Sequence, residues 1–182
     1  NNNKAPFYKV SYNNKIVLDS SLLGIERKDE SFYNNLEIIT ISEPKLVKDN
    51  YTMHQGKQKN IEYEANQYIV ELQNENEKRI NIIFNISDDG VAFKYKFPEA
   101  SDSIFKIEDE KTTYNFTSNT KAWLQPMSRA KTGWEQVHPS YEEHYISNIS
   151  VDEKSPIGEG WVYPALFKAN DTWLVVSETG LK

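Results

Sequence analysis

The chain has 182 residues, 13% of them aromatic, and a formal net charge of −6. Its length suits one large all-β domain and fits two smaller ones as well; it suffices to bury about 70% of the surface that the unfolded chain would expose. The negative charge argues against nucleic acid or an anionic membrane as the main partner, because both need a basic face.

Cysteine is absent from the sequence, which excludes disulfides, thiolate metal sites and cysteine nucleophiles. No apolar run approaches the ~20 residues that a membrane-spanning helix needs. The N-terminus is polar and has no apolar signal core, so an export signal has either been removed or was never there.

Short apolar runs separated by turn residues follow one another along the first half of the chain. Residues 7–18 predict two strands around Asn13-Asn14, and residues 19–25 predict a turn into a short apolar segment. The pattern then predicts three more strands, at residues 36–42, 45–51 and 61–72, the first two as a pair broken at Glu43-Pro44.

The clearest pattern lies in residues 79–98, where eight apolar residues recur at every second position in two halves. This period is typical of strands with one buried face. Between the halves lies Ser87-Asp88-Asp89-Gly90, which suits a tight turn because Asp caps its own backbone and Gly accepts a positive φ. The segment therefore predicts a β-hairpin at the centre of a β-sandwich, ending at Pro98.

The second half of the chain is less regular. Short strands are predicted at residues 104–107 and 112–116, and a strand at Ala122 leads into long aromatic-rich loops up to Tyr145. Residues 147–160 are polar and predict turns. A last hairpin is predicted from two runs around Ala169-Asn170-Asp171, residues 161–167 and 172–176.

Two features have the residue types of a metal site. The three histidines, His54, His138 and His144, do not have the usual spacing of zinc ligands. Asp88-Asp89-Gly90 lacks the alternating acidic residues of a calcium loop, and the chemistry of a turn explains it better.

Glu142-Glu143 is the most informative carboxylate pair, because Tyr141 and Tyr145 flank it. Carboxylates beside aromatic rings can bind sugar hydroxyls while the rings stack on the sugar, and a raised pKa would suit acid–base catalysis. A solvated acidic loop is the other interpretation, and it has the greater weight from the local sequence alone.

Several motifs together resemble the N-terminal β-sandwich domain of glycoside hydrolase family 97, the α-glycosidases of Bacteroides-type polysaccharide degraders. The most specific is Gly90-Val91-Ala92-Phe93-Lys94-Tyr95 with the two Asp residues before it. The others occur in the same order as in the family: Asp19-Ser20-Ser21-Leu22-Leu23-Gly24-Ile25, Ala122-Trp123, Pro139-Ser140-Tyr141-Glu142 and Val176-Ser177-Glu178-Thr179-Gly180-Leu181.

The resemblance implies an antiparallel supersandwich of the galactose-mutarotase type, followed in the family by a (β/α)8 barrel that carries the catalytic carboxylates. Residues 1–182 would then be an N-terminal domain, itself incomplete, with the barrel beyond Lys182. The expected function is to support and partly line the active site of an α-glucosidase or α-galactosidase acting on oligosaccharides. We expect residues 1–182 alone to be inactive and the protein to be periplasmic.

The resemblance also implies site residues. Family members of the α-glucosidase type hold Ca²⁺ near the catalytic groups, and Glu178 matches the Glu ligand that the sandwich domain supplies. The loop from Trp134 to Tyr145 would shape the sugar pocket, with Trp134, Tyr141 and Glu142 as substrate-binding residues. A free-standing carbohydrate-binding sandwich and a purely structural sandwich are the alternatives.

Overall fold

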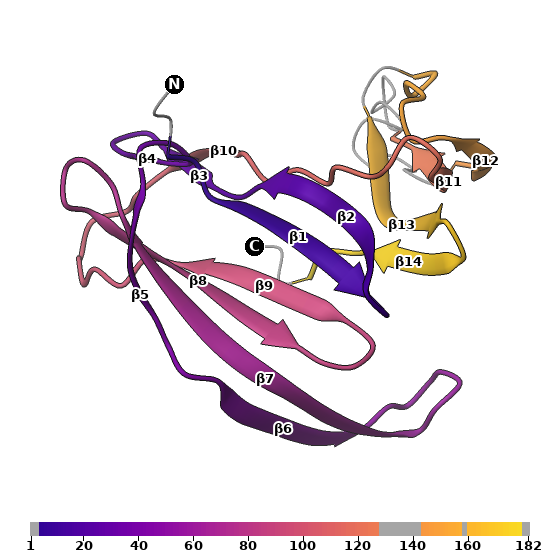
Figure 1. The fold of residues 1–182 in the computed structure, drawn as a ribbon, viewed down its shortest axis with the longest axis horizontal. Coiled ribbons are helices and arrows are strands. Elements are labelled where there is room, and N and C mark those ends of the chain that lie inside the picture. The colour runs from indigo at the N-terminus through magenta and orange to yellow at the C-terminus, as the bar shows by residue number, and fades with distance from the viewer. Residues whose placement is uncertain (1–3, 128–142, 158–159, 180–182) are drawn as a thin grey trace, which may run out of the picture. The chain divides into compact units, whose positions relative to one another are not determined.

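The computed structural model describes residues 4–127, 143–157 and 160–179, and every regular element in these ranges is a β-strand (Figure 1). The strands are β1 (Phe7–Tyr12), β2 (Lys15–Leu22), β3 (Ile25–Arg27), β4 (Ser31–Phe32), β5 (Glu37–Ile41), β6 (Lys45–Thr52), β7 (Asn60–Gln73), β8 (Arg79–Ile86), β9 (Val91–Lys96), β10 (Ile107–Glu110), β11 (Lys121–Pro126), β12 (Ile146–Ser150), β13 (Trp161–Ala169) and β14 (Thr172–Val176). Each strand pair between them is antiparallel, which confirms the predicted all-β class.

The chain divides into two compact units. Unit 1 comprises Asn1–Phe7 and Leu22–Thr113, and unit 2 comprises Tyr8–Ser21 and Tyr114–Lys182. The chain therefore leaves unit 1 after a few residues, builds a hairpin of unit 2, and returns to complete unit 1. Each unit has sheets of its own, which are described in turn.

The largest sheet of unit 1 is built around β7, the longest strand, and contains the predicted hairpin as β8 and β9. Phe84 lies opposite Phe93 and Ile82 opposite Tyr95, so the alternating apolar residues share one face as the sequence predicted. The turn is closed by a 2.9 Å bond from the Ser87 amide to the Gly90 carbonyl. The Ser87 hydroxyl also donates a 2.7 Å hydrogen bond to Asp89, so the predicted turn is confirmed.

Strands β5 and β6 do not pair with each other. They follow one another along the same edge of β7 (Figure 1). Ile38 of β5 lies opposite Leu72 of β7, and Val47 of β6 lies opposite Ala65 of β7. The break at Glu43-Pro44 is confirmed, but it separates two strands that share a partner. Because proline has no amide hydrogen, it fits this gap in the ladder.

Tyr95 links two of the motifs that carried the resemblance. Its hydroxyl accepts a 2.8 Å hydrogen bond from the Gly24 amide and lies 2.7 Å from the Thr112 hydroxyl. Burial raises the pKa of Tyr95, so the side chain stays a neutral phenol that can both donate and accept. A Cβ on Gly24 would lie 2.3 Å from the Cβ of Tyr33, so this close approach requires glycine.

Arg27 is the most deeply buried charge among the described residues, with a side chain only 1% exposed. Its guanidinium donates two hydrogen bonds to Asp29, of 2.9 and 2.6 Å, and a third to Glu99. Three phenylalanine rings surround it, with centroids 4.1–5.3 Å from the guanidinium carbon: Phe32, Phe97 and Phe105. We call these six residues the Arg27 cluster.

The second sheet of unit 1, β10-β3-β4, corrects the prediction for residues 104–107 and 112–116. The strand is Ile107–Glu110, which consists mostly of the residues expected to connect the two strands, and Ile104 is 98% exposed. The spacing of apolar residues placed the strand wrongly because β10 pairs with β3 through its backbone while all four of its side chains are exposed. Residues 112–116 form no strand; Asn115 makes an isolated bridge to Asp19, and the Thr113 amide donates a 2.9 Å hydrogen bond to the Leu22 carbonyl.

In unit 2, β1 and β2 form the predicted hairpin, with Asn13 and Asn14 both at positive φ. Asparagine tolerates this conformation better than most residues. Strand β2 runs on to Leu22, so the turn predicted at residues 19–25 is wrong. The extension exists because Asn115 pairs with Asp19 and donates its amide to the buried Ser21 hydroxyl at 2.8 Å.

The other sheet of unit 2 has the order β12-β11-β13-β14. Its last two strands are the predicted final hairpin, turning at Asn170 and Asp171. Strand β12, however, lies in the polar segment for which only turns were predicted. Its pairing with β11 buries Ala122 and Leu124, which with Ala165 form a small core in unit 2.

Candidate functional site

Only one of the four predicted site residues lies in the described part of the chain. Trp134, Tyr141 and Glu142 fall within residues 128–142, outside the described residues. Glu178 is described: it lies two residues beyond the end of β14, outside any strand, and is exposed. The structure therefore gives the surroundings of Glu178 and leaves the loop residues as predictions.

Glu178 does not form a metal site with its described neighbours. In residues 4–127, 143–157 and 160–179, no three His, Asp or Glu side chains come together closely enough to hold a metal. An exposed carboxylate at a strand end fits the chemistry of Ca²⁺, which takes six to eight oxygen ligands. It would be one ligand of several, and the others would have to come from beyond the described residues.

A hollow of about 330 Å³ lies on unit 2, on the face of β13 that packs against the small core. Its lining is mostly aromatic and aliphatic and includes two polar side chains: Tyr114, Asn115, Phe116, Leu124, Val151, Asp152, Trp161, Val162, Tyr163, Ala165, Phe167 and Val176. Phe116 and Phe167 stack within it, with ring centroids 4.1 Å apart. The volume is at the lower end of the range for small-molecule sites.

The chemistry of this hollow allows two uses. Trp161 and Tyr163 could stack on a sugar while Asp152 accepts its hydroxyl protons, or the apolar lining could receive a further segment of protein. The sequence interpretation missed it. A period of two through Trp161, Tyr163, Ala165 and Phe167 was the available signal, and it was interpreted only as a strand.

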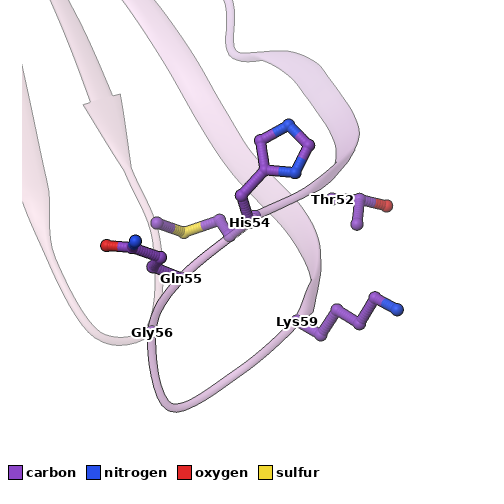
Figure 2. A pocket seen from close by; sticks show the side chains of 6 residues that line it. Thr52, His54, Gln55, Gly56 and Lys59 are labelled. Carbon is purple, nitrogen blue, oxygen red and sulfur yellow. The ribbon is translucent and has the colours of Figure 1, made fainter.

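A second hollow, of about 430 Å³, lies at the loop between β6 and β7 in unit 1. It is lined by Thr52, Met53, His54, Gln55, Gly56 and Lys59. Figure 2 shows the labelled side chains of His54, Gln55 and Lys59 pointing in different directions rather than toward a common point. Such an arrangement does not converge on a ligand, so this hollow is the weaker candidate.

None of the described segments forms a helix with the length and apolar character that crossing a membrane requires.

The decisive comparison is with protein-family models. The model described as "Glycosyl-hydrolase 97 N-terminal" matches residues 1–182, the whole chain. The chain belongs to this family. The resemblance inferred from the turn and strand at residues 88–95 and from the other motifs is thus confirmed.

Individual relatives of this family 97 chain agree. It is 23% identical over 173 residues to a probable retaining alpha-galactosidase from Streptomyces bingchenggensis, covering 95% of the chain and 25% of that protein. A solved structure of a beta-arabinopyranosidase is similar with a TM-score of 0.90 and 35% identity, over 99% of this chain and 29% of that one.

The fold is shared with a glycoside hydrolase family 97 enzyme from Pseudoalteromonas sp. strain K8, solved with panose and with acarbose. The panose complex matches with a TM-score of 0.71 and 22% identity, over 92% of this chain and 24% of that one. The chain thus spans about a quarter of the length of these relatives.

Proposed function

We propose that this chain is the N-terminal part of an α-glycosidase, an α-glucosidase or α-galactosidase that hydrolyses oligosaccharides. The observation that carries the proposal is the family match over all of residues 1–182. In the proposed protein the two units belong to a supersandwich of the galactose-mutarotase type. A (β/α)8 barrel beyond Lys182 supplies the catalytic carboxylates.

Within that protein, the proposed role of the chain is to support the barrel and to line part of the active site. The unit 2 hollow supports this role, because an aromatic lining with Asp152 suits a surface that another segment or a sugar covers. The proposed substrate-binding residues are Trp134, Tyr141 and Glu142.

The names of the relatives suggest a substrate panel. A β-L-arabinopyranoside has the ring configuration of an α-D-galactopyranoside and lacks only the C6 hydroxymethyl group. One pocket can therefore accept both, since a missing hydroxymethyl changes contacts at one ring position only. The alignments with the two relatives named for these sugars cover 99% and 95% of this chain. We therefore place α-galactosides and β-L-arabinopyranosides first in the panel.

The test expresses the complete reading frame that contains this chain and assays p-nitrophenyl α-D-glucoside, α-D-galactoside and β-L-arabinopyranoside. Hydrolysis of at least one supports the proposal, and the preferred sugar identifies the subtype. A reading frame that ends at Lys182, or a complete protein that binds oligosaccharides and cleaves none, would favour the alternative of a non-catalytic carbohydrate-binding module.

We also propose that Glu178 is a ligand of Ca²⁺ in the complete protein. An exposed carboxylate beyond the last strand of unit 2 can extend toward ligands on another element. A bound Ca²⁺ would supply a fixed positive charge close to the reacting groups. Of the residues that the structure describes, Glu178 is the one that we propose as a ligand, through its carboxylate oxygens.

Calcium titration calorimetry of the complete protein tests this assignment apart from catalysis. Glu178→Gln should weaken calcium binding about tenfold or more, whereas Glu153→Gln, another exposed carboxylate of unit 2, should leave it unchanged. Equal calcium affinity of wild type and Glu178→Gln would rule out the ligand role.

The loop assignment and the location have their own tests. Trp134→Ala should raise KM more than it lowers the melting temperature, and a large loss of stability with normal KM would show that Trp134 is a core residue.

A periplasmic location is proposed from the family resemblance, and fractionation of the source cells checks it.

A further inference from the structure

Two tryptophans lie together on the face of the unit 2 sheet opposite to the hollow. In the ladder of β11, β13 and β14, Lys121, Lys168 and Trp173 form one row of cross-strand neighbours, and Trp123, Leu166 and Val175 form the next. Neighbours in a row share a face, and residues two apart along a strand share it too. These six residues are called the Trp123–Trp173 face.

The two indole rings meet diagonally above β13, with centroids 4.8 Å apart and planes at 48°. Unlike the opposite face, which buries Ala122, Leu124 and Ala165, this one is open: Trp173 is 52% exposed and Val175 is 67% exposed. Trp123 is partly buried, so the exposed ring of Trp173 beside it is the part of the pair that a ligand could cover.

The charges of this face narrow the choice of ligand. Lys121 and Lys168 lie directly opposite each other, and Lys168 Nζ is 5.3 Å from the centre of the Trp173 ring. Neither lysine has an ion pair among the described residues. Like charges opposite one another destabilise a sheet, and an anion placed between them would remove the repulsion.

We propose that the Trp123–Trp173 face binds an acidic glycan, a saccharide that carries carboxylates such as those of uronic acids. The C–H groups of a sugar ring would stack on the exposed indole of Trp173, and the carboxylate would pair with Lys121 and Lys168. Single-stranded nucleic acid also combines rings with negative charge, but membership of a glycosidase family favours the saccharide.

The inference is separate from the proposed catalytic function. The residues of the Trp123–Trp173 face are not part of the proposed active site. The protein could therefore hydrolyse glycosides without binding an acidic glycan at this face, or bind the glycan without hydrolysing glycosides. The experiment therefore measures binding and hydrolysis on the same preparations.

The test titrates the complete protein with tetragalacturonate and, as a neutral control of equal length, with maltotetraose. Only the binding that depends on Trp173 is assigned to this face. Trp173→Ala should weaken tetragalacturonate binding about tenfold, a change that the loss of one stacked ring can produce. It should leave the kcat for an aryl glycoside within about twofold, because the face is not in the proposed catalytic machinery.

The double variant Lys121→Gln and Lys168→Gln keeps both rings and should also weaken tetragalacturonate binding. The affinity that remains should no longer depend on the salt concentration. Matched controls come from unit 1: Tyr51→Ala removes an aromatic side chain of similar exposure, and Lys94→Gln removes a strand lysine. Both should bind as the wild type does.

Several results would overturn the proposal. They are wild-type protein that does not bind tetragalacturonate, equal affinity of wild type and Trp173→Ala, equal Trp173-dependent affinity for maltotetraose, and tighter binding of oligo(dT). A loss of more than about 10 °C in melting temperature for Trp173→Ala, with full binding by the double lysine variant, would show that the face packs against protein instead.

Discussion

The protein places a cation against aromatic rings in both units, with opposite surroundings. In unit 1, Arg27 is buried among three phenylalanine rings and paired with Asp29 and Glu99. In unit 2, Lys168 lies over the half-exposed ring of Trp173 and has no carboxylate partner among the described residues.

The difference separates a structural role from a binding role. Burial alone would lower the pKa of the Arg27 guanidinium, but the hydrogen bonds that it donates to Asp29 and Glu99 outweigh burial and raise the pKa, so the charge is satisfied inside the unit. Arginine suits this place because its planar fork binds a carboxylate through two parallel bonds. The two lysines of the Trp123–Trp173 face have no carboxylate partner among the described residues, so they are available to the anion that we propose.

Removing the buried cation is the strongest test of this contrast. Arg27→Met should lower the free energy of unfolding by about 3 kcal/mol, because Asp29 and Glu99 lose their partner beside apolar rings. The value is at the lower end for a broken buried pair, since both carboxylates are partly exposed and water can reach them. Urea unfolding followed by far-ultraviolet circular dichroism measures it, because all four tryptophans belong to unit 2 and would not report on unit 1.

Arg27→Lys is the matched control for that experiment. Lysine keeps the charge but loses the two-bond fork, so its loss should be smaller, about 1–2 kcal/mol. If Arg27→Met is as stable as the wild type, the phenylalanine rings alone hold the cluster and the ion pairs contribute little.

Sequence patterns predicted the elements whose side chains alternate between two environments. The hairpin at residues 79–98 was predicted because Phe84, Phe93 and their neighbours share one face, and the loop closed by Ser87 and Gly90 has the chemistry of a turn. Strand β10 was missed because its four side chains are all exposed, so its pairing is set by the backbone and by β3.

Sites were harder to predict than strands. Arg27 gives no local signal, because its partners Glu99 and Phe105 are more than seventy positions away. The ring contact between Trp123 and Trp173 likewise depends on the register of three strands. The calcium-ligand role of Glu178 was predicted only from the motif resemblance, because a family supplies information that a single sequence does not contain.

The Arg27 cluster should also show in the acid stability of the protein. The hydrogen bond from Arg27 holds the pKa of Asp29 below its ordinary value of 3.8, and Lys78 acts in the same direction. A lowered folded-state pKa contributes stability above pH 3.8 that is lost as the pH falls through the folded value. The stability gap between wild type and Asp29→Asn should thus narrow below about pH 4.

Urea unfolding of both proteins at pH 6 and pH 3 measures that gap. Glu62→Gln, on an exposed position of β7, is the control and should give a gap close to zero at both values. A gap between wild type and Asp29→Asn that stays constant from pH 6 to pH 3 would contradict the linkage.

The smallest expected effect concerns the half-buried Lys168 of unit 2. A double-mutant cycle of Lys168→Gln and Trp173→Leu should give a coupling energy of about 0.5 kcal/mol, because a lysine that water can reach gains little from an aromatic ring. Leucine removes the ring but keeps an apolar side chain on β14, which limits the loss of packing. A coupling energy near that of a buried pair, about 3 kcal/mol, would mean that the Trp123–Trp173 face is covered in the complete protein. The contrast with Arg27 would then disappear, since both cations would serve the fold.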